Sequence, residues 1–263
     1  MDSFRIPWTA VYGNHDNESK IGIEKQCEFY SNGKYCMFKR GTVSGNSNFI
    51  IGISIDGELK RVMYMLDSHG VFRKPDILPD QIEYMKQKAL ILNKKYGTVS
   101  EGFMAFHIPV DCYIKAAYSK GYATDEKKFF NIGVDVNGFD DDFGFDYESG
   151  GSGGYIATNS NFDEFLKLAN IKGVFVGHNH NSCTCIEYRG IKWVYGLKTG
   201  QYDYHIGGQI GGTLITVNNE NNVLLRAFFT DEPQYGNNGC VPWSQVFESE
   251  FNKKYNLILL FLE

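Results

Sequence analysis

Residues 8–16 read WTAVYGNHD, an apolar run that ends abruptly in a polar loop. The apolar part is rich in β-branched and aromatic residues, which is typical of a strand. The side chains of Asn14, His15 and Asp16 all carry nitrogen or oxygen atoms that can bind a transition metal. In open α/β sheets, ligands gather just beyond the carboxyl ends of strands. The stretch therefore predicts a strand that delivers candidate ligands at its end.

The same arrangement recurs twice further along the chain. Residues 102–106 (GFMAF) run into His107, and residues 174–176 (VFV) precede the pair His178 and His180. Because side chains alternate along an extended chain, the two imidazoles of that pair are expected on the same side. A single histidine is more often a loop or core residue than a ligand. Three strand ends that all carry such donors nevertheless predict one shared metal site.

The composition is that of a globular protein, and it argues against two kinds of partner. The chain has 263 residues, of which 43% are hydrophobic and 22% charged, and its formal net charge is -5. It therefore lacks the basic excess that neutralises nucleic-acid phosphates, and no nucleic-acid partner is expected. No apolar run approaches the roughly 20 residues that span a bilayer, so no membrane span is expected. The six cysteines form no Cys-x-x-Cys pair and leave the redox compartment open.

Hydrophobic periodicity alternates between helical and extended segments, which indicates an α/β fold. Helices are predicted after Ser19, from Pro79 to Gly97, and over residues 162–169 with Gly173 as the stop. Strands are predicted on either side of Asp56 and Gly57 and within residues 185–229, while residues 257–262 fit a strand or the end of a buried helix. The Gly- and Asp-rich stretch 122–154 has weak periodicity and is predicted to be a long loop insertion.

Three short stretches, at residues 13–16, 106–107 and 177–180, resemble the third, fourth and fifth motifs of the calcineurin-like metallophosphoesterases. Within that superfamily, residues 6–18 (IPWTAVYGNHDNE) are most similar to a purple-acid-phosphatase-related branch. Further similarity lies in residues 64–68, 81–84 and 195–200. The resemblance covers nearly the whole chain. It implies a single phosphoesterase domain over residues 1–263, with a four-layer αββα sandwich built from two mixed sheets.

The resemblance also implies a metal site. Asn14, His107 and His178 would coordinate one ion, and His180 would coordinate the other. Imidazole, amide and carboxylate donors suit iron, zinc or manganese about equally well. The implied activity is hydrolysis of phosphate monoesters or diesters by a hydroxide that the two ions activate. The implied partner is therefore a phosphate-ester substrate.

Two residues of the first motif carry implied catalytic roles. His15 would not be a ligand but would face the scissile phosphate, where it stabilises charge or protonates the leaving oxygen. Asp16 would hydrogen-bond to His15 and hold its ring in orientation.

The first two motifs of the superfamily, Asp-x-His and Gly-Asp-x-x-Asp or Gly-Asp-x-x-Tyr, do not occur in this sequence. They supply the bridging carboxylate and most ligands of the first metal. Two interpretations follow: the sequence is partial and the fold incomplete at its N-terminus, or the protein is degenerate and has lost catalysis. The alternative to hydrolysis is accordingly a catalytically inactive binding module of the same superfamily.

Other constellations give weaker signals. The acidic run 140–142 lacks the ligand register and closing Glu of an EF-hand, so a solvated loop is favoured over calcium. Cys183 and Cys185 are interpreted as strand residues, and His69 and His205 are given no role. A serine hydrolase is not indicated because no Gly-x-Ser-x-Gly elbow between a strand and a helix is predicted, and no phosphate-binding P-loop is found.

Overall fold

The computed structural model describes residues 2–70, 74–97, 101–124, 130–133, 142–148, 150, 154–200, 203–205, 210–217, 223–229 and 257–261. The chain divides into two compact units. Unit 1 comprises Met1–Val110, Tyr155–Val174 and Leu257–Glu263, and unit 2 comprises Asp111–Gly154 and Phe175–Asn256. The single domain expected over residues 1–263 stays a prediction.

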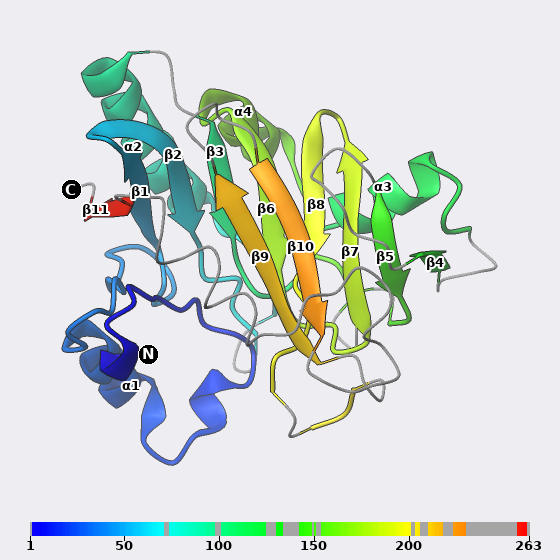
Figure 1. The fold of residues 1–263 in the computed structure, drawn as a ribbon, viewed down its shortest axis with the longest axis horizontal. Coiled ribbons are helices and arrows are strands. Elements are labelled where there is room, and N and C mark those ends of the chain that lie inside the picture. The colour runs from blue at the N-terminus through cyan, green and yellow to red at the C-terminus, as the bar shows by residue number, and fades with distance from the viewer. Residues whose placement is uncertain are drawn as a thin grey trace. The chain divides into compact units, whose positions relative to one another are not determined.

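Unit 1 is built on a mixed sheet with the strand order β11-β1-β2-β3-β6 (Figure 1). Its strands are β1 (Phe49–Ile55), β2 (Glu58–Met65), β3 (Gly102–Ala105), β6 (Ile171–Val176) and β11 (Leu257–Phe261). The predicted hairpin is confirmed: β1 and β2 pair antiparallel across Asp56 and Gly57, whose φ angles are 53° and 83°. The pairing of β2 with β3 is parallel, and that of β11 with β1 is antiparallel.

The helices of unit 1 form where the periodicity predicted them. They are α1 (Gly22–Ser31), α2 (Pro79–Tyr96) and α4 (Ser160–Leu168), with the short 3-10 turns η1 (Asp2–Phe4) and η2 (Asp16–Glu18). α2 packs against α4, and the Tyr64 ring of β2 meets the Phe165 ring of α4 edge to face, with centroids 5.2 Å apart. Asn159 caps α4, because its side chain accepts the Phe162 backbone N–H. Gly97 ends α2 with a φ of 82°.

Unit 2 is a second, mainly antiparallel assembly. Its strands are β4 (Phe130–Gly133), β5 (Phe143–Asp146), β7 (Ser182–Tyr188), β8 (Ile191–Tyr195), β9 (Gly211–Val217) and β10 (Val223–Phe229). Four of them follow the order β8-β7-β5-β4, and β9 pairs with β10 as a separate hairpin. The helix α3 (Cys112–Ser119) lies on β7 and β8. Its Tyr113 ring contacts Trp193 and Tyr195, with centroids 5.4 and 4.8 Å away.

The mixed α/β class is thus confirmed, but three local predictions need correction and one helix was missed. Residues 8–12 form no strand, and only Trp8 makes an isolated bridge, to Cys36. α4 ends at Leu168, and Gly173 lies inside β6 rather than stopping the helix. The segment 122–154, predicted as a loop, contains β4 and β5, since β5 gains a pairing partner in β7. α3 was not predicted. Residues 134–141, which include the first two residues of the acidic run 140–142, lie outside the described residues.

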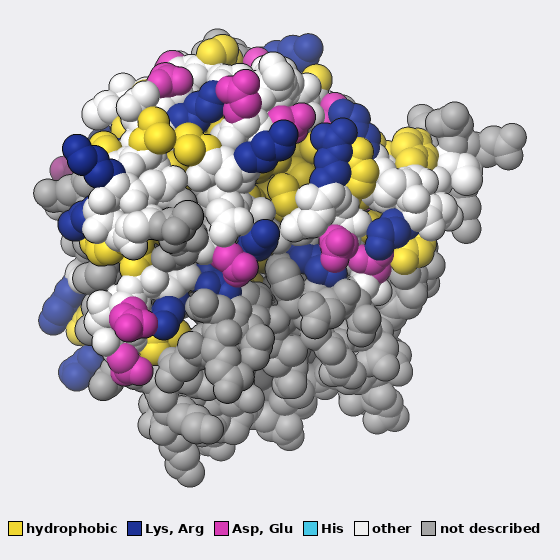
Figure 2. Space-filling model, turned by 90° about the horizontal axis from the view of Figure 1, so that it is seen from above, with side chains coloured by type: hydrophobic (Ala, Val, Ile, Leu, Met, Phe, Trp, Pro, Cys, Tyr) yellow, Lys and Arg dark blue, Asp and Glu magenta, His cyan; other side chains and the backbone are white. Residues whose placement is uncertain are grey.

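Charges of both signs mix on the surface. On the face shown in Figure 2, Lys and Arg side chains stand beside Asp and Glu side chains. Some charges are paired within a unit, as where Lys86 of α2 lies 2.7 Å from Glu164 of α4. In the described part of the chain, no helix combines the length and the apolar character that crossing a membrane requires.

Candidate functional site

Asn14 and His107 lie next to each other in unit 1, although 93 positions separate them in the sequence. The Oδ1 atom of Asn14 is 2.9 Å from Nε2 of His107. This distance suits a hydrogen bond, and it also suits two ligands of one ion. Two atoms about 2.1 Å from an ion and at right angles around it are about 3.0 Å apart. The structure therefore brings two of the four predicted ligands together, with their donor atoms converging.

Two glycines make this approach possible. A Cβ atom on Gly13 would lie 2.9 Å from Cδ2 of the His107 ring. A Cβ atom on Gly70 would lie only 2.2 Å from Cβ of Asn14. Real side chains do not tolerate such distances, so Gly13 and Gly70 allow Asn14 and His107 to reach each other.

A buried polar network lies beneath this pair, and sequence reasoning missed its role. Ser68 Oγ accepts the backbone N–H of Ile108 at 2.9 Å and so holds the peptide that follows His107. The Gln81 side chain of α2 donates to Asn48 Oδ1 and to the carbonyl oxygen of Asp67, both at 2.7 Å. All of these polar side chains are buried. Because buried polar groups need fixed partners, the network defines one conformation for the loop that follows β2.

His15 and Asp16 do not form the predicted pair. The His15 side chain is 72% exposed, and its Nδ1 lies 2.8 Å from Glu18 Oε1. Asp16 instead accepts the backbone N–H of Gly13. Burial, the largest effect, raises the pKa of Asp16, while the Gly13 N–H opposes this shift. The expected hydrogen bond from Asp16 to the His15 ring is not formed in this structure, because the 3-10 turn of η2 brings Glu18 to His15 and directs Asp16 back toward its own loop. The catalytic roles of His15 and Asp16 stay predictions.

His178 and His180 belong to unit 2, on the turn that follows β6. The argument that an extended chain would align their rings fails, because His178 has a φ of 70° and the Asn179 N–H donates to the Gly177 carbonyl oxygen at 2.8 Å. These features define a tight turn. A positive φ is uncommon for a residue with a side chain and is found more often at functional sites.

The His180 ring is closely held within unit 2. Its Nδ1 lies 3.1 Å from the carbonyl oxygen of Tyr204, and its ring stacks on the Tyr204 ring with centroids 4.3 Å apart. Its backbone N–H donates to Glu148 Oε2 at 2.9 Å. Burial raises the pKa of Glu148, and hydrogen bonding to the His180 N–H opposes that shift. Glu148 and Tyr204 were not predicted as site residues.

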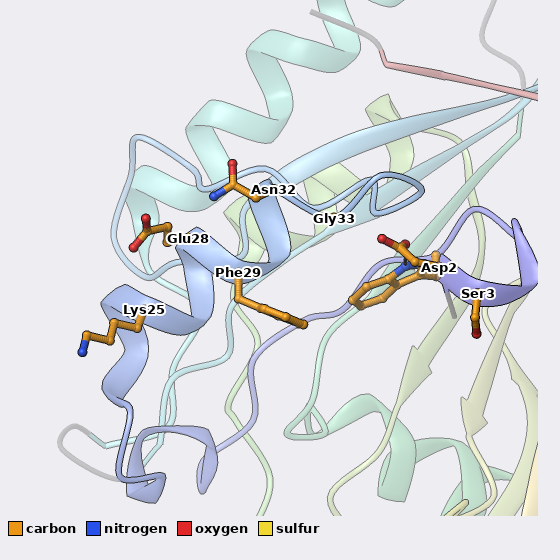
Figure 3. A pocket seen from close by; sticks show the side chains of 8 residues that line it. Asp2, Ser3, Lys25, Glu28, Phe29, Asn32 and Gly33 are labelled. Carbon is orange, nitrogen blue, oxygen red and sulfur yellow. Dashed lines mark hydrogen bonds between the residues drawn. The ribbon is translucent and has the colours of Figure 1, made fainter.

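A separate groove of about 730 Å³ lies in unit 1 between α1 and the N-terminal segment (Figure 3). Figure 3 shows Phe29 projecting from α1 toward the side of the groove that carries Asp2. None of the predicted site residues lines it. A smaller groove of about 320 Å³ is lined by both His15 and Asp16. The second groove therefore offers the space that a ligand beside the first motif would need.

The donor set fits a transition metal bound by nitrogen and amide oxygen. His107 supplies an imidazole nitrogen and Asn14 supplies an amide oxygen, and the two atoms face each other. Transition metals accept both kinds of ligand. The described residues include no group of three or more His, Cys, Asp or Glu side chains that could hold a metal ion. They therefore provide no ready-made site for two ions bridged by a carboxylate. The arrangement at Asn14 and His107 thus accounts for two ligands of one ion.

The fold is a mixed α/β arrangement, consistent with a metallophosphatase-like sandwich, in which His107 follows β3 and His178 follows β6. No family model matches the chain. Among curated proteins, the chain is similar to "Probable inactive purple acid phosphatase 29" of Arabidopsis thaliana, with 24% identity over 239 residues. That match covers 79% of this chain and 53% of the relative, so the chain spans about half of the relative's length. These findings support a distant relationship to the purple acid phosphatases.

Proposed function

We propose that this chain is a metal-dependent phosphoesterase that hydrolyses phosphate monoesters or diesters. The observation that carries the proposal is the 2.9 Å approach of Asn14 Oδ1 to His107 Nε2. The distant relationship to a purple acid phosphatase supports it. In the proposal, His178 joins these two residues on one ion and His180 binds a second ion. Iron, zinc and manganese all suit such donors.

When bound, such ions polarise a phosphoryl group and lower the pKa of a water molecule. Residues of this chain hold the candidate ligands in place. Ser68 holds the backbone next to His107, and Gly13 leaves room for the imidazole ring. An ionised Glu18 carboxylate can only accept a hydrogen bond, so it orients the exposed His15 with a hydrogen on Nδ1. In the doubly protonated form of the ring, His15 also carries a hydrogen on Nε2 and can transfer that proton to a leaving-group oxygen, keeping the hydrogen on Nδ1.

The test is hydrolysis of p-nitrophenyl phosphate and bis(p-nitrophenyl) phosphate by the purified chain after loading with zinc, manganese or iron. We expect metal-dependent turnover that falls by at least about a hundredfold in Asn14→Ala and in His107→Ala, because even groups that only support a ligand are worth 10–100-fold. His205→Ala is the matched control and should keep the wild-type rate. Equal rates in His107→Ala and His205→Ala would contradict the proposed site.

A second candidate is a catalytically inactive binding module. Two observations favour it: the similar Arabidopsis protein is itself called probably inactive, and the described residues contain no carboxylate-rich metal cluster. Metal content measured on the purified chain, together with the turnover assay, separates the candidates. Metal bound without turnover of either ester supports the inactive module, and turnover excludes it. If the chain binds no metal under any loading condition and hydrolyses neither ester, the phosphoesterase fails and the inactive module is favoured.

A further inference from the structure

The segment 203–205 in unit 2 has no role in the proposed function so far, yet two of its residues contact His180. Tyr204 supplies both a stacked ring, inclined at 27° to the imidazole, and a carbonyl oxygen 3.1 Å from Nδ1. Asp203 Oδ2 lies 3.4 Å from the same Nδ1 atom. On the backbone side, Glu148 accepts the His180 N–H. The imidazole is thus held by its face, by one ring nitrogen and by its own backbone.

The contacts at Nδ1 determine which nitrogen carries the hydrogen. A carbonyl oxygen and a carboxylate can only accept, so the ring nitrogen that faces Tyr204 and Asp203 must donate. In a neutral imidazole, a hydrogen on Nδ1 leaves the lone pair on Nε2. In histidine ligands generally, the nitrogen that donates a hydrogen bond leaves the other ring nitrogen to bind the metal.

We propose that Tyr204 and Asp203 are positioning residues that hold the His180 ring so that Nε2 is the atom it offers to a metal ion. The inference rests on the proposed function, since it assigns His180 as a ligand. It goes further by naming the donor atom and the residues that select it.

The exposure of the two positioning residues argues against a purely structural role. Tyr204 is 57% exposed and the Asp203 side chain 61% exposed, so neither contributes much buried apolar surface to the fold. Their replacement should therefore leave unit 2 folded and act on the His180 ring. Asp203 also accepts the Tyr204 backbone N–H at 2.8 Å, which orders the segment itself.

The first measurement uses the metal-free chain. Long-range ¹H–¹⁵N NMR reports the tautomer of the His180 ring. The measurement is made at about pH 8, above the ordinary histidine pKa of about 6.5. A His180→Gln variant identifies which signals belong to His180. We expect the Nδ1–H form in the wild type and in Tyr204→Phe, which keeps the stacked ring and the carbonyl. Tyr204→Ala keeps the backbone carbonyl but removes the stacked ring that holds the imidazole against it, and Asp203→Ala removes the second acceptor, so both should shift the ring toward Nε2–H. A wild type that is Nε2–H, or a tautomer that Tyr204→Ala leaves unchanged, overturns the inference.

The second measurement is Zn²⁺ affinity by titration calorimetry on the same variants. We expect Tyr204→Ala to weaken binding by 10–100-fold, as loss of a partner behind a ligand does, and Tyr204→Phe to match the wild type. Equal Zn²⁺ binding by wild type and Tyr204→Ala overturns the positioning role and leaves the proposed function standing. If the tautomer changes as expected but no variant binds Zn²⁺, the holding of the ring is supported and the proposed function fails.

Discussion

Gly13 stands where a larger side chain would collide with a candidate ligand. In Gly13→Ala, the new Cβ would lie 2.9 Å from His107 Cδ2, and the ring would have to move away from Asn14. We expect Zn²⁺ affinity to fall by about 10-fold or more, as expected when a ligand loses its orientation. Gly200→Ala is a matched control, because the nearest atom there is a flexible lysine nitrogen at 3.5 Å. Equal affinity in both variants would show that the ring position does not matter.

Ser68 and Ser54 offer a second comparison between single residues. Both are buried, but Ser68 Oγ accepts the Ile108 N–H at 2.9 Å, whereas Ser54 Oγ has no hydrogen-bond partner among the described residues. Ser68→Ala leaves a backbone donor unsatisfied, so we expect the free energy of unfolding to fall by about 1–3 kcal/mol. Ser54→Ala should change it by less than about 0.5 kcal/mol.

Urea denaturation of the two serine variants makes the comparison. It is decisive because both substitutions remove the same atoms from buried positions. If the two variants lose the same stability, the bond to Ile108 contributes nothing beyond packing.

At the scale of single elements, the helices were predictable because their signals are local. The apolar faces of α1, α2 and α4 and the stop at Gly97 are all properties of neighbouring residues. Strands depend on distant partners instead. Residues 8–12 looked like a strand, yet the backbone N–H of Tyr12 is bound by the side chain of Ser47 rather than by a neighbouring strand. β5 looked like a loop and becomes a strand through β7.

The candidate site likewise has a part that local sequence patterns predict and a part that depends on tertiary contacts. The approach of Asn14 to His107 was expected from donors that follow apolar runs. Ser68, Glu148 and Tyr204 could not be found from sequence, because their roles arise from tertiary contacts that no local pattern reports. Gly13 carried a weak signal, since glycine inside a polar motif can mark a close approach.

The start of α2 gives a prediction about pH. Asp80 Oδ2 accepts the Ser44 N–H at 2.9 Å, and this bond is the main reason that its pKa lies below the ordinary value. An acid with a lowered pKa in the folded state stabilises the fold above its unfolded pKa, here about 3.9. That contribution disappears as the pH falls through the folded pKa. Asp80→Asn, which keeps an acceptor but loses the charge, should therefore be less stable than the wild type near neutral pH.

The difference between Asp80→Asn and the wild type should close as the pH falls below about 4. Urea denaturation at several pH values measures it. A gap that stays constant down to the most acid condition would mean that the charge of Asp80 does not stabilise α2 or the loop at Ser44.

At the scale of the whole molecule, the cysteines report separately on the two units. Among the described cysteines, only Cys36, in unit 1, is not fully buried. Cys185, in unit 2, lies in β7, where burial raises its pKa to about 12. At about pH 8, such a thiol stays protonated, and the thiolate is the reactive form. Native Cys185 should therefore resist alkylation both because it is enclosed and because it stays protonated.

Among the described cysteines, we expect iodoacetamide to modify Cys36 first in the native protein, while Cys185 reacts only in concentrated urea. Burial also raises the pKa of Cys36, so its reaction should be slow, but the reagent can reach it. Peptide mass spectrometry after a time course measures the order. Modification of Cys185 in native buffer at the rate seen in urea would contradict the buried β7 strand. Because β7 also carries α3 and pairs with β5, that result would count against the packing of unit 2 as a whole.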